Sequence, residues 1–219
     1  MSLTVYGAPL SPFVRKVRLL LAEKGLDYQL EIVLPFNQPA WFSELSPLGR
    51  IPALRDGDTT LADSSVICQY IEDKYPQSLQ LLGDTPEERA KVRWIEKYAD
   101  YEVAPLSTFA VFRNRIVLPS IGQQCDEDAA QKALTQKLPP HFDYLEKLLG
   151  DADYFVGGKL TLADLAVATQ LVNLQHANEQ LDAHRWPKLH AHFERIKARE
   201  TAASMIASEQ KVIAKMTGK

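Results

Sequence analysis

The chain changes its pattern of apolar residues at Pro76, and this change constrains the fold more than any other feature. Before Pro76, short apolar stretches alternate with helical patterns and with turns that contain glycine or proline. After it, apolar residues recur almost only at the spacing of helices. A chain of 219 residues is long enough for two small domains. The sequence therefore predicts an α/β domain over residues 1–78 and an all-helical domain over residues 87–219.

The first part of the chain predicts a strand, a helix and a second strand. The strands are Leu3–Ala8 and Tyr28–Leu34. The helix between them begins after Ser11, a favourable N-cap residue, with Pro12 at the first helical position. The basic residues predicted to lie mostly on the face opposite its apolar side chains are Arg15, Lys16 and Arg18. Because the strands flank a crossover helix, we expect them to run parallel.

A hairpin and another helix complete the predicted first domain. Ile51 opens a third strand, Asp56-Gly57-Asp58 forms a turn, and Thr59–Ala62 is the fourth strand. Asp63 then caps a helix that ends near Pro76. The predicted order of the domain is therefore βαβ followed by ββα.

The second domain is predicted to consist of helices. The first two patterns are long and contain proline: Glu87–Arg115, with a bend expected at Pro105, and Asp126–Leu149, with a kink or break expected at Pro139-Pro140. The remaining predicted helices are Thr161–Ala177, Pro187–Arg199 and Ser204–Met216. The first of these begins with Thr161-Leu162-Ala163-Asp164, which resembles a capping box with Asp in the place of Glu or Gln.

Composition excludes several functional classes. Hydrophobic residues make up 46% of the chain, enough for a core, and the net charge of −3 offers no basic excess for nucleic acid. No run of about 18 apolar residues predicts a membrane span, and the N-terminus lacks the pattern of a signal peptide. The two cysteines, Cys68 and Cys125, have neither metal-ligand nor CxxC spacing. We therefore expect a cytoplasmic protein without a metal site.

Four segments carry motifs that occur together in one protein family. They are Ser11–Val17 (SPFVRKV), Pro47–Leu54 (PLGRIPAL), Asp63–Ile67 (DSSVI) and Gly158–Asp164 (GKLTLAD). In this order they resemble the cytosolic glutathione transferases, with a serine-type N-terminal motif similar to that of bacterial, theta-class and tau-class members. The resemblance covers nearly the whole chain. It implies a thioredoxin-like N-terminal domain followed by a C-terminal helical bundle.

By this resemblance, Ser11 is the expected catalytic residue. A glutathione-type thiol has a pKa of about 8.5–9, so it is mostly protonated at neutral pH. Lowering that pKa by about two units needs about 2.7 kcal/mol, which a hydroxyl donating to sulfur and the N-terminal end of a helix can supply together. The alternatives are that Ser11 is only an N-cap, or that Tyr6 contacts the thiolate, because other transferase classes use a tyrosine near the end of the first strand.

The helix start also lacks cysteine. Glutaredoxins share the α/β fold and carry Cys-Pro-x-Cys where this chain has Ser11-Pro12-Phe13-Val14. Without a cysteine, no mixed disulfide with glutathione can form at this position. Conjugation is therefore favoured over thiol–disulfide exchange, and the cysteine-type transferase classes are disfavoured.

The resemblance also implies a role for the Ile51-Pro52 bond. It is expected to be cis, which would leave the backbone N–H and C=O of Ile51 available to the cysteinyl part of glutathione, added as an extra strand. A trans proline at the start of an edge strand is the alternative.

Four further residues are expected to bind the two ends of glutathione. Asp63 and Ser64, at a helix start, suit the carboxylate and ammonium of the γ-glutamyl group. Arg50 and Gln38, in the preceding loop, suit the glycyl carboxylate. The alternatives are a plain helix cap for Asp63 and a solvated side chain for Gln38.

The electrophile is expected to bind between the domains. The candidate lining residues are Phe13, Tyr101, Phe109 and Phe112. The last three fall on roughly one helical face, a pattern that is also typical of a core.

The predicted function is that of a glutathione S-transferase in detoxification, which activates glutathione, its co-substrate, for attack on a small hydrophobic electrophile. Family members are typically homodimers, and neither a nucleic acid nor a membrane is expected as a partner. One alternative is a non-catalytic regulator of the stringent-starvation type, which shares the two-domain fold. Another is a glutathione-dependent isomerase or dehalogenase, although Leu10-Ser11-Pro12 replaces the Ser-Ser-Cys of zeta-type isomerases.

Overall fold

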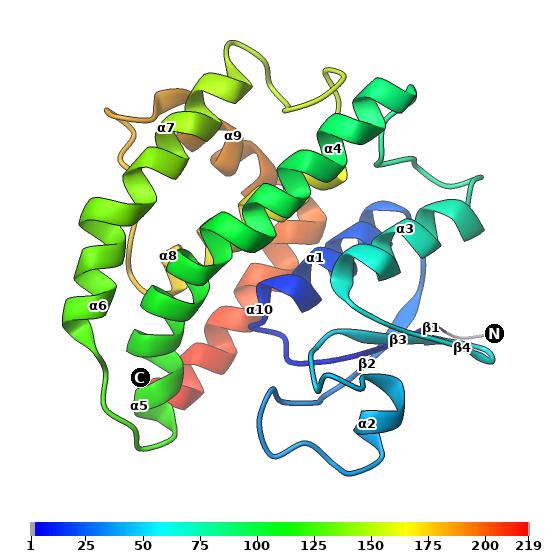
Figure 1. The fold of residues 1–219 in the computed structure, drawn as a ribbon, viewed down its shortest axis with the longest axis horizontal. Helices are drawn as coiled ribbons and strands as arrows, with labels where there is room; N and C mark the ends of the chain where they lie inside the picture. The colour runs from blue at the N-terminus through cyan, green and yellow to red at the C-terminus, as the bar shows by residue number, and fades with distance from the viewer. Residues whose placement is uncertain (1–2, 219) are drawn as a thin grey trace.

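The first domain contains one mixed four-stranded sheet in the order β2-β1-β3-β4, shown in the computed structural model of Figure 1, which describes residues 3–218. β1 (Leu3–Tyr6) pairs in parallel with β2 (Tyr28–Glu31) and antiparallel with β3 (Ala53–Asp56). β3 pairs antiparallel with β4 (Thr59–Ala62). This topology confirms the predicted thioredoxin-like order.

β4 has the predicted bounds, whereas the other three strands are shorter than the sequence predicts. β1 ends at Tyr6 rather than Ala8. Strand pairing of β1 ends where Tyr6 lies opposite Glu31 on one side and Ala53 on the other, and beyond it only Gly7 bonds the following segment, accepting the N–H of Val33 at 3.5 Å. The second strand therefore stops before Leu34, and the third begins after Ile51.

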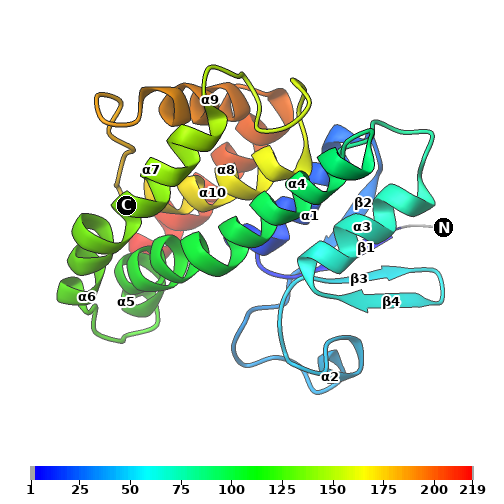
Figure 2. The same ribbon diagram turned by 45° about the horizontal axis from the view of Figure 1, so that its top comes forward.

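Helices cover both faces of the sheet (Figure 2). α1 (Pro12–Glu23) and α3 (Ser64–Lys74) lie on one face, together with the second domain. The short α2 (Phe42–Leu45) lies on the other face, where its two buried side chains pack in a small cluster with Tyr6 and Ala53.

The second domain is helical, as predicted. Its elements are α4 (Pro86–Tyr98), η1 (Ala99–Val103), η2 (Pro105–Val117), α5 (Leu118–Ser120), α6 (Glu127–Lys132), η3 (Ala133–Lys137), α7 (Leu138–Leu149), α8 (Leu162–His176), α9 (Pro187–Lys197) and α10 (Glu200–Thr217), where η denotes π-helix. α10 begins four residues before the predicted Ser204. None of the helices within residues 3–218 is long and apolar enough to cross a membrane.

The prolines inside the long helical runs do not break them. Each π-helical segment ends two residues before a proline: η1 before Pro105, η2 before Pro119 and η3 before Pro139. Proline cannot donate the i→i−4 hydrogen bond, and its ring clashes with the carbonyl of residue i−4. The wider π turn accommodates both effects, so the chain stays helical through Pro139-Pro140.

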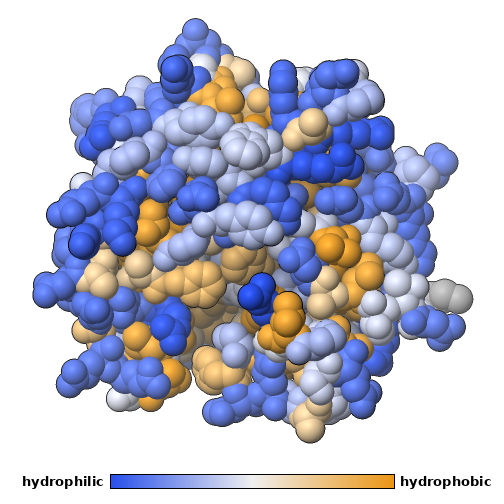
Figure 3. All heavy atoms as spheres, in the orientation of Figure 1, coloured by the Kyte–Doolittle hydropathy of each residue, from blue (hydrophilic) through white to orange (hydrophobic). Residues whose placement is uncertain are grey.

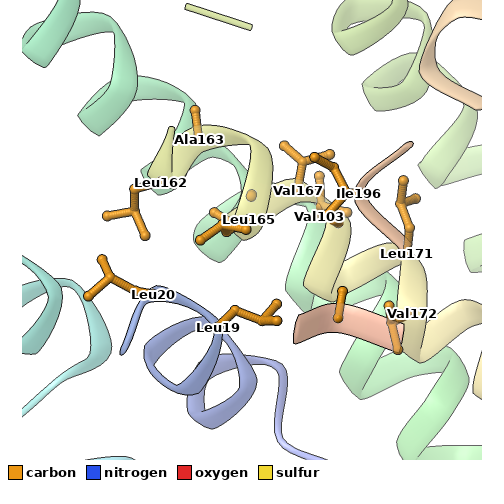
Figure 4. Packing of buried hydrophobic residues seen from close by; sticks show 14 of the residues in the cluster. Leu19, Leu20, Val103, Leu162, Ala163, Leu165, Val167, Leu171, Val172 and Ile196 are labelled. Atoms are coloured by element: carbon orange, nitrogen blue, oxygen red, sulfur yellow. The ribbon is translucent and has the colours of Figure 1, made fainter. Parts of the chain in front are cut away.

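α8 is the central helix of the core. Nearly all of its residues are buried, and Leu162 and Leu165 lie on the side that faces Leu19 and Leu20 of α1 (Figure 4). The predicted capping box is confirmed: the backbone N–H of Thr161 donates to Asp164 Oδ2 at 2.7 Å. The carboxylate of Asp164 also accepts the N–H of Phe155 and pairs with Nε2 of His192.

Arg15 and Lys16, predicted to lie mostly on the face of α1 opposite its apolar side chains, are not at the surface. Both side chains are fully buried, because the second domain covers that side of α1. Arg15 pairs with Glu209, and Lys16 pairs with both Glu96 and Asp100. Arg18 is half-buried and donates to the hydroxyl of Tyr28.

Residues 75–85 connect the two domains without helix or strand. The domain limits 1–78 and 87–219 stay a prediction, and their outermost residues, 1, 2 and 219, lie outside the described residues.

Candidate functional site

Ser11 occupies the N-cap of α1, as predicted. Its backbone is extended, and its Oγ accepts the N–H of Val14 at 3.4 Å. Within residues 3–218 its O–H has no acceptor, so it is available to donate. The half-buried hydroxyl and the amides of the first helical turn therefore lie at the same end of α1, where the helix dipole favours an anion.

Gly7 brings this helix end close to Ile51. A Cβ on Gly7 would lie 2.5 Å from Cγ2 of Val14 and 3.4 Å from Cβ of Ile51. Only glycine permits this approach, because real Cβ atoms do not come within 3.0 Å of a neighbour. The end of β1, the start of α1 and Ile51 therefore meet at one place.

The predicted cis bond between Ile51 and Pro52 is confirmed. In the described part of the chain, the N–H and C=O of Ile51 have no hydrogen-bond partner. This residue thus offers both groups of an unpaired strand edge beside the start of α1.

Tyr6 packs away from α1. Its buried ring lies 5.7 Å from that of Trp41, and the guanidinium of Arg55 lies 5.7 Å from its centroid. It belongs to the small cluster on the α2 face of the sheet. This position is that of a packing residue.

Asp63 caps α3 with one of its two carboxylate oxygens. Its Oδ1 accepts the N–H groups of Ser65 at 2.9 Å and Val66 at 3.2 Å. Its Oδ2 has no partner within residues 3–218, and its side chain is exposed. Ser64, the first residue of α3, is buried.

The loop before β3 is held by its own polar groups. Nε2 of Gln38 donates to the carbonyl of Gly49 at 2.8 Å, and the hydroxyl of Ser46 bonds the backbone of Arg50. Gln38 therefore braces the loop, whereas the side chain of Arg50 is exposed.

Three of the four predicted electrophile-site residues lie at the surface or near it. The rings of Phe13 and Phe109 lie 6.5 Å apart, and Phe109 is 51% exposed. Tyr101 is 64% exposed and lies beside the ammonium of Lys97. Phe112 is a correction: it is 3% exposed and packs in the core against His176. The π turns of η1 and η2 change the register, so Phe112 does not share a face with Tyr101 and Phe109.

An open groove of about 400 Å³ runs beside Tyr101. Its walls come from η1 and η2 on one side and from η3 and α7 on the other. The lining residues are Tyr101, Glu102, Pro105, Leu106, Gln136, Lys137, Pro140 and His141. In the view of Figure 3, a hollow bordered by apolar side chains lies below the helical run from α4 to α5.

Neither cysteine is placed as a nucleophile. Burial raises the pKa of the Cys68 thiol well above its usual value. The pKa of the exposed Cys125 is also raised, by partial desolvation and by the carboxylate of Glu127. Within residues 3–218, no three His, Cys, Asp or Glu side chains are grouped to hold a metal ion.

Sequence reasoning missed a charged cluster between the domains. Lys16 contacts Glu96 at 2.8 Å and Asp100 at 2.6 Å, and Ser65 lies beside them with Lys97. The available signal was a charged residue within an apolar pattern, Lys16 between Val14 and Val17. Its partners lie about 80 residues further along the chain, beyond the reach of local patterns.

Comparisons with known proteins agree with this geometry. Residues 5–79 match the glutathione S-transferase N-terminal domain, and residues 113–209 match the glutathione S-transferase C-terminal domain. A glutathione S-transferase of Hyoscyamus muticus is 35% identical over 175 residues, which cover 75% of this chain and 79% of the relative. A maleylacetoacetate isomerase of Pseudomonas aeruginosa is 33% identical over 80% of this chain and 81% of its own length.

A solved structure gives the same result for the fold. The crystal structure of a glutathione S-transferase from Rhodospirillum rubrum F11 superposes with a TM-score of 0.85 at 27% identity, covering 93% of this chain and 91% of that one. Both domains and their order are therefore shared with known members. This chain belongs to the glutathione S-transferase family.

Proposed function

We propose that this glutathione transferase activates its co-substrate with Ser11, whose hydroxyl donates a hydrogen bond to the glutathione thiolate. The observation that supports this role is the unused O–H of Ser11 at the N-terminal end of α1. The thiolate would also face the amides and the dipole of the helix, which favour the anion over the neutral thiol. A serine-type mechanism follows, in which the sulfur attacks a carbon electrophile.

The rest of glutathione is placed by the neighbouring loops. The cysteinyl backbone pairs with the N–H and C=O of Ile51, next to Pro52, as an added strand. The γ-glutamyl group lies at the start of α3, near Asp63 and Ser64, where the helix amides suit a carboxylate. The exposed guanidinium of Arg50 takes the glycyl carboxylate, and Gln38 holds the loop that carries it.

The electrophile binds beside the sulfur, between the two domains. Phe13 and Phe109 supply an apolar surface there, and Tyr101 lies further along the same helical run. These aromatic side chains favour a small hydrophobic electrophile. We take the domains to be residues 1–78 and 87–219, and the active form to be a cytoplasmic homodimer, as is typical of the family.

Replacing Ser11 tests the proposal. Ser11→Gly keeps a tolerated N-cap residue but removes the hydroxyl. We expect the pKa of bound glutathione to rise by about one unit or more, because a hydrogen bond to a charged group contributes about 1.5–3 kcal/mol. The ultraviolet absorbance of the thiolate, titrated against pH, measures this pKa, and kcat should fall with it at neutral pH.

Tyr6→Phe is the matched control, since it removes the rival hydroxyl and keeps the ring. Its titration should coincide with that of the unmodified protein. If instead Tyr6→Phe raises the thiol pKa and Ser11→Gly does not, the roles assigned here are reversed. Failure of the protein to bind immobilised glutathione would favour a non-catalytic regulator.

Glutathione-dependent isomerisation is a second candidate, because the Pseudomonas relative is named an isomerase. In that reaction the thiolate adds to a carbon–carbon double bond, the resulting single bond rotates, and elimination of the thiolate restores the double bond. Product analysis separates the two functions: a stable thioether indicates conjugation, and recovery of free glutathione with an isomerised product indicates the second candidate.

A further inference from the structure

The cluster between the domains joins three helices at one point. Nζ of the buried Lys16, from α1, contacts Oε1 of Glu96 at 2.8 Å and Oδ2 of Asp100 at 2.6 Å, from α4 and η1. The hydroxyl of Ser65, from α3, lies 3.4 Å from both Nζ of Lys16 and Oδ2 of Asp100. α3 and α4 therefore lie side by side here, as Figures 1 and 2 show.

The buried part of this cluster carries an excess of negative charge. Two carboxylates, Glu96 and Asp100, share the single ammonium of Lys16. One oxygen of each, Oε2 of Glu96 and Oδ1 of Asp100, is buried without a hydrogen-bond partner. A second cation nearby would balance the charge, since an uncompensated buried charge is costly.

Lys97 is that second cation. Its Nζ donates to Oγ of Ser65 at 2.7 Å, and Ser65 in turn can donate to Asp100. Its stem is half-buried, and Nζ lies 5.2 Å from the centroid of the Tyr101 ring. Among residues 3–218, Lys97 forms no ion pair with a carboxylate. Its ammonium is thus held by a hydroxyl and a ring, and no carboxylate of the described chain neutralises it directly.

The ammonium of Lys97 lies beside the first turn of α3. Ser65 is the second residue of the helix, and its backbone N–H is already bonded by Asp63. The negative groups of the cluster lie inside, and the positive group lies at the rim beside the helix amides. The N–H groups of Ser65 and Val66 are taken by Asp63, so an approaching carboxylate meets the ammonium of Lys97 and the positive end of the helix dipole.

We propose that Lys97, a residue of the second domain, binds the α-carboxylate of the γ-glutamyl group of glutathione, with Ser65 and Asp100 positioning its ammonium. The assignment rests on the proposed function, which places the γ-glutamyl group at Asp63 and Ser64. It adds a contact from the helical domain to a binding site otherwise built from the thioredoxin-like domain.

The test pairs a protein variant with a ligand variant. One ligand is S-methylglutathione, which has no thiol to activate. The other is the same molecule with 4-aminobutyryl in place of γ-glutamyl, so that only the α-carboxylate is missing. We expect Lys97→Met to weaken binding of S-methylglutathione about tenfold and to change binding of the analogue by less than about twofold. Isothermal titration calorimetry measures both affinities.

Lys91→Met is the matched control, since Lys91 is an exposed lysine of the same helix. It should leave both affinities unchanged, and Lys97→Arg should restore most of the lost affinity. Ser65→Ala should weaken S-methylglutathione binding, and adding it to Lys97→Met should have little further effect, because the two residues act together.

Equal weakening of both ligands by Lys97→Met, or weakening of neither, would overturn the assignment of Lys97. Failure of the proposed function itself would give a different result. The unmodified protein would then bind neither ligand, and the assignment of Lys97 would fail together with the proposed function.

Discussion

His176 belongs to a second buried polar group, which ties α1 to the end of the chain. Its Nε2 lies 2.8 Å from Oε2 of Glu209, and Glu209 also receives Nη2 of Arg15 at 2.6 Å. Nη1 of Arg15 donates to the carbonyl of Thr169 and to Oδ1 of Asn173. The fully buried guanidinium is therefore bonded to α8 and α10 at once.

This group makes stability depend on pH. Burial, opposed by the bond to Glu209 and assisted by Arg15, lowers the pKa of His176 below its usual value of 6.5. The unfolded state then binds a proton more readily than the folded state, so stability is present above pH 6.5 and is lost as pH falls from 6.5 toward the lowered pKa. We expect the free energy of unfolding in urea to decrease between pH 7.5 and 5.5.

His176→Gln provides the comparison, because glutamine keeps a donor for Glu209 but does not titrate in this range. The variant should show a flatter profile over the same interval. Glu209 does not contribute to the slope between pH 7.5 and 5.5. Its pKa is lowered from 4.5, so the stability that its carboxylate provides is lost only below this interval. A profile that is equally steep in both proteins would contradict the role of His176.

At the scale of elements, local signals predicted the helix starts that carry a capping side chain. Ser11, Asp63 and Thr161 were recognised as caps because their bonds reach only two or three residues along the chain. The limits of the first three strands were misplaced because they depend on pairing between strands, which residues within a single strand do not reveal. Phe112 was misplaced because a π turn shifts the face on which a side chain lies. The Ser11-Pro12 helix start was visible in sequence, whereas the contact of Lys97 with Ser65 forms only on folding.

The start of α8 gives a prediction at this scale. Asp164 accepts the N–H groups of Phe155 and Thr161 and the hydroxyl of Thr161, and it pairs with His192; Asp164, Thr161 and His192 are fully buried. We expect Asp164→Ala to lower the free energy of unfolding by about 3 kcal/mol or more, because several buried polar groups lose their partner. Urea unfolding measures this loss.

Asp126→Ala is the matched control, since Asp126 also caps a helix but is exposed. Its loss should be about 1 kcal/mol, the usual value for an N-cap. Equal losses in the two variants would show that Asp164 acts only as a cap.

At the scale of the whole molecule, α1 belongs to both domains. It covers the sheet on one side, and on the other it inserts Arg15 and Lys16 among α8, α10 and α4. An isolated first domain would expose Leu19 and Leu20, which the second domain covers (Figure 4). The two domains are distinct in architecture but depend on each other for burial.

We therefore expect the chain to unfold in a single transition. A variant that keeps only Trp41, with Trp94→Phe and Trp186→Phe, reports the first domain by fluorescence, while circular dichroism reports mainly the helices. The two urea curves should coincide. A fragment of residues 1–78 should lack a cooperative transition. Separated curves, or a fragment that unfolds cooperatively, would show that the first domain is stable alone.

The two buried cations of α1 have a consequence for how such a protein can diversify. Arg15 and Lys16 are consecutive, so their side chains leave the helix in different directions and anchor it to different partners. With two anchors, α1 can neither rotate about its axis nor slide, and Ser11 at its start keeps its orientation. Phe109 and Tyr101 are exposed and lie outside both anchors. If these side chains contact the electrophile, as proposed, substitutions there change the range of electrophiles without moving Ser11.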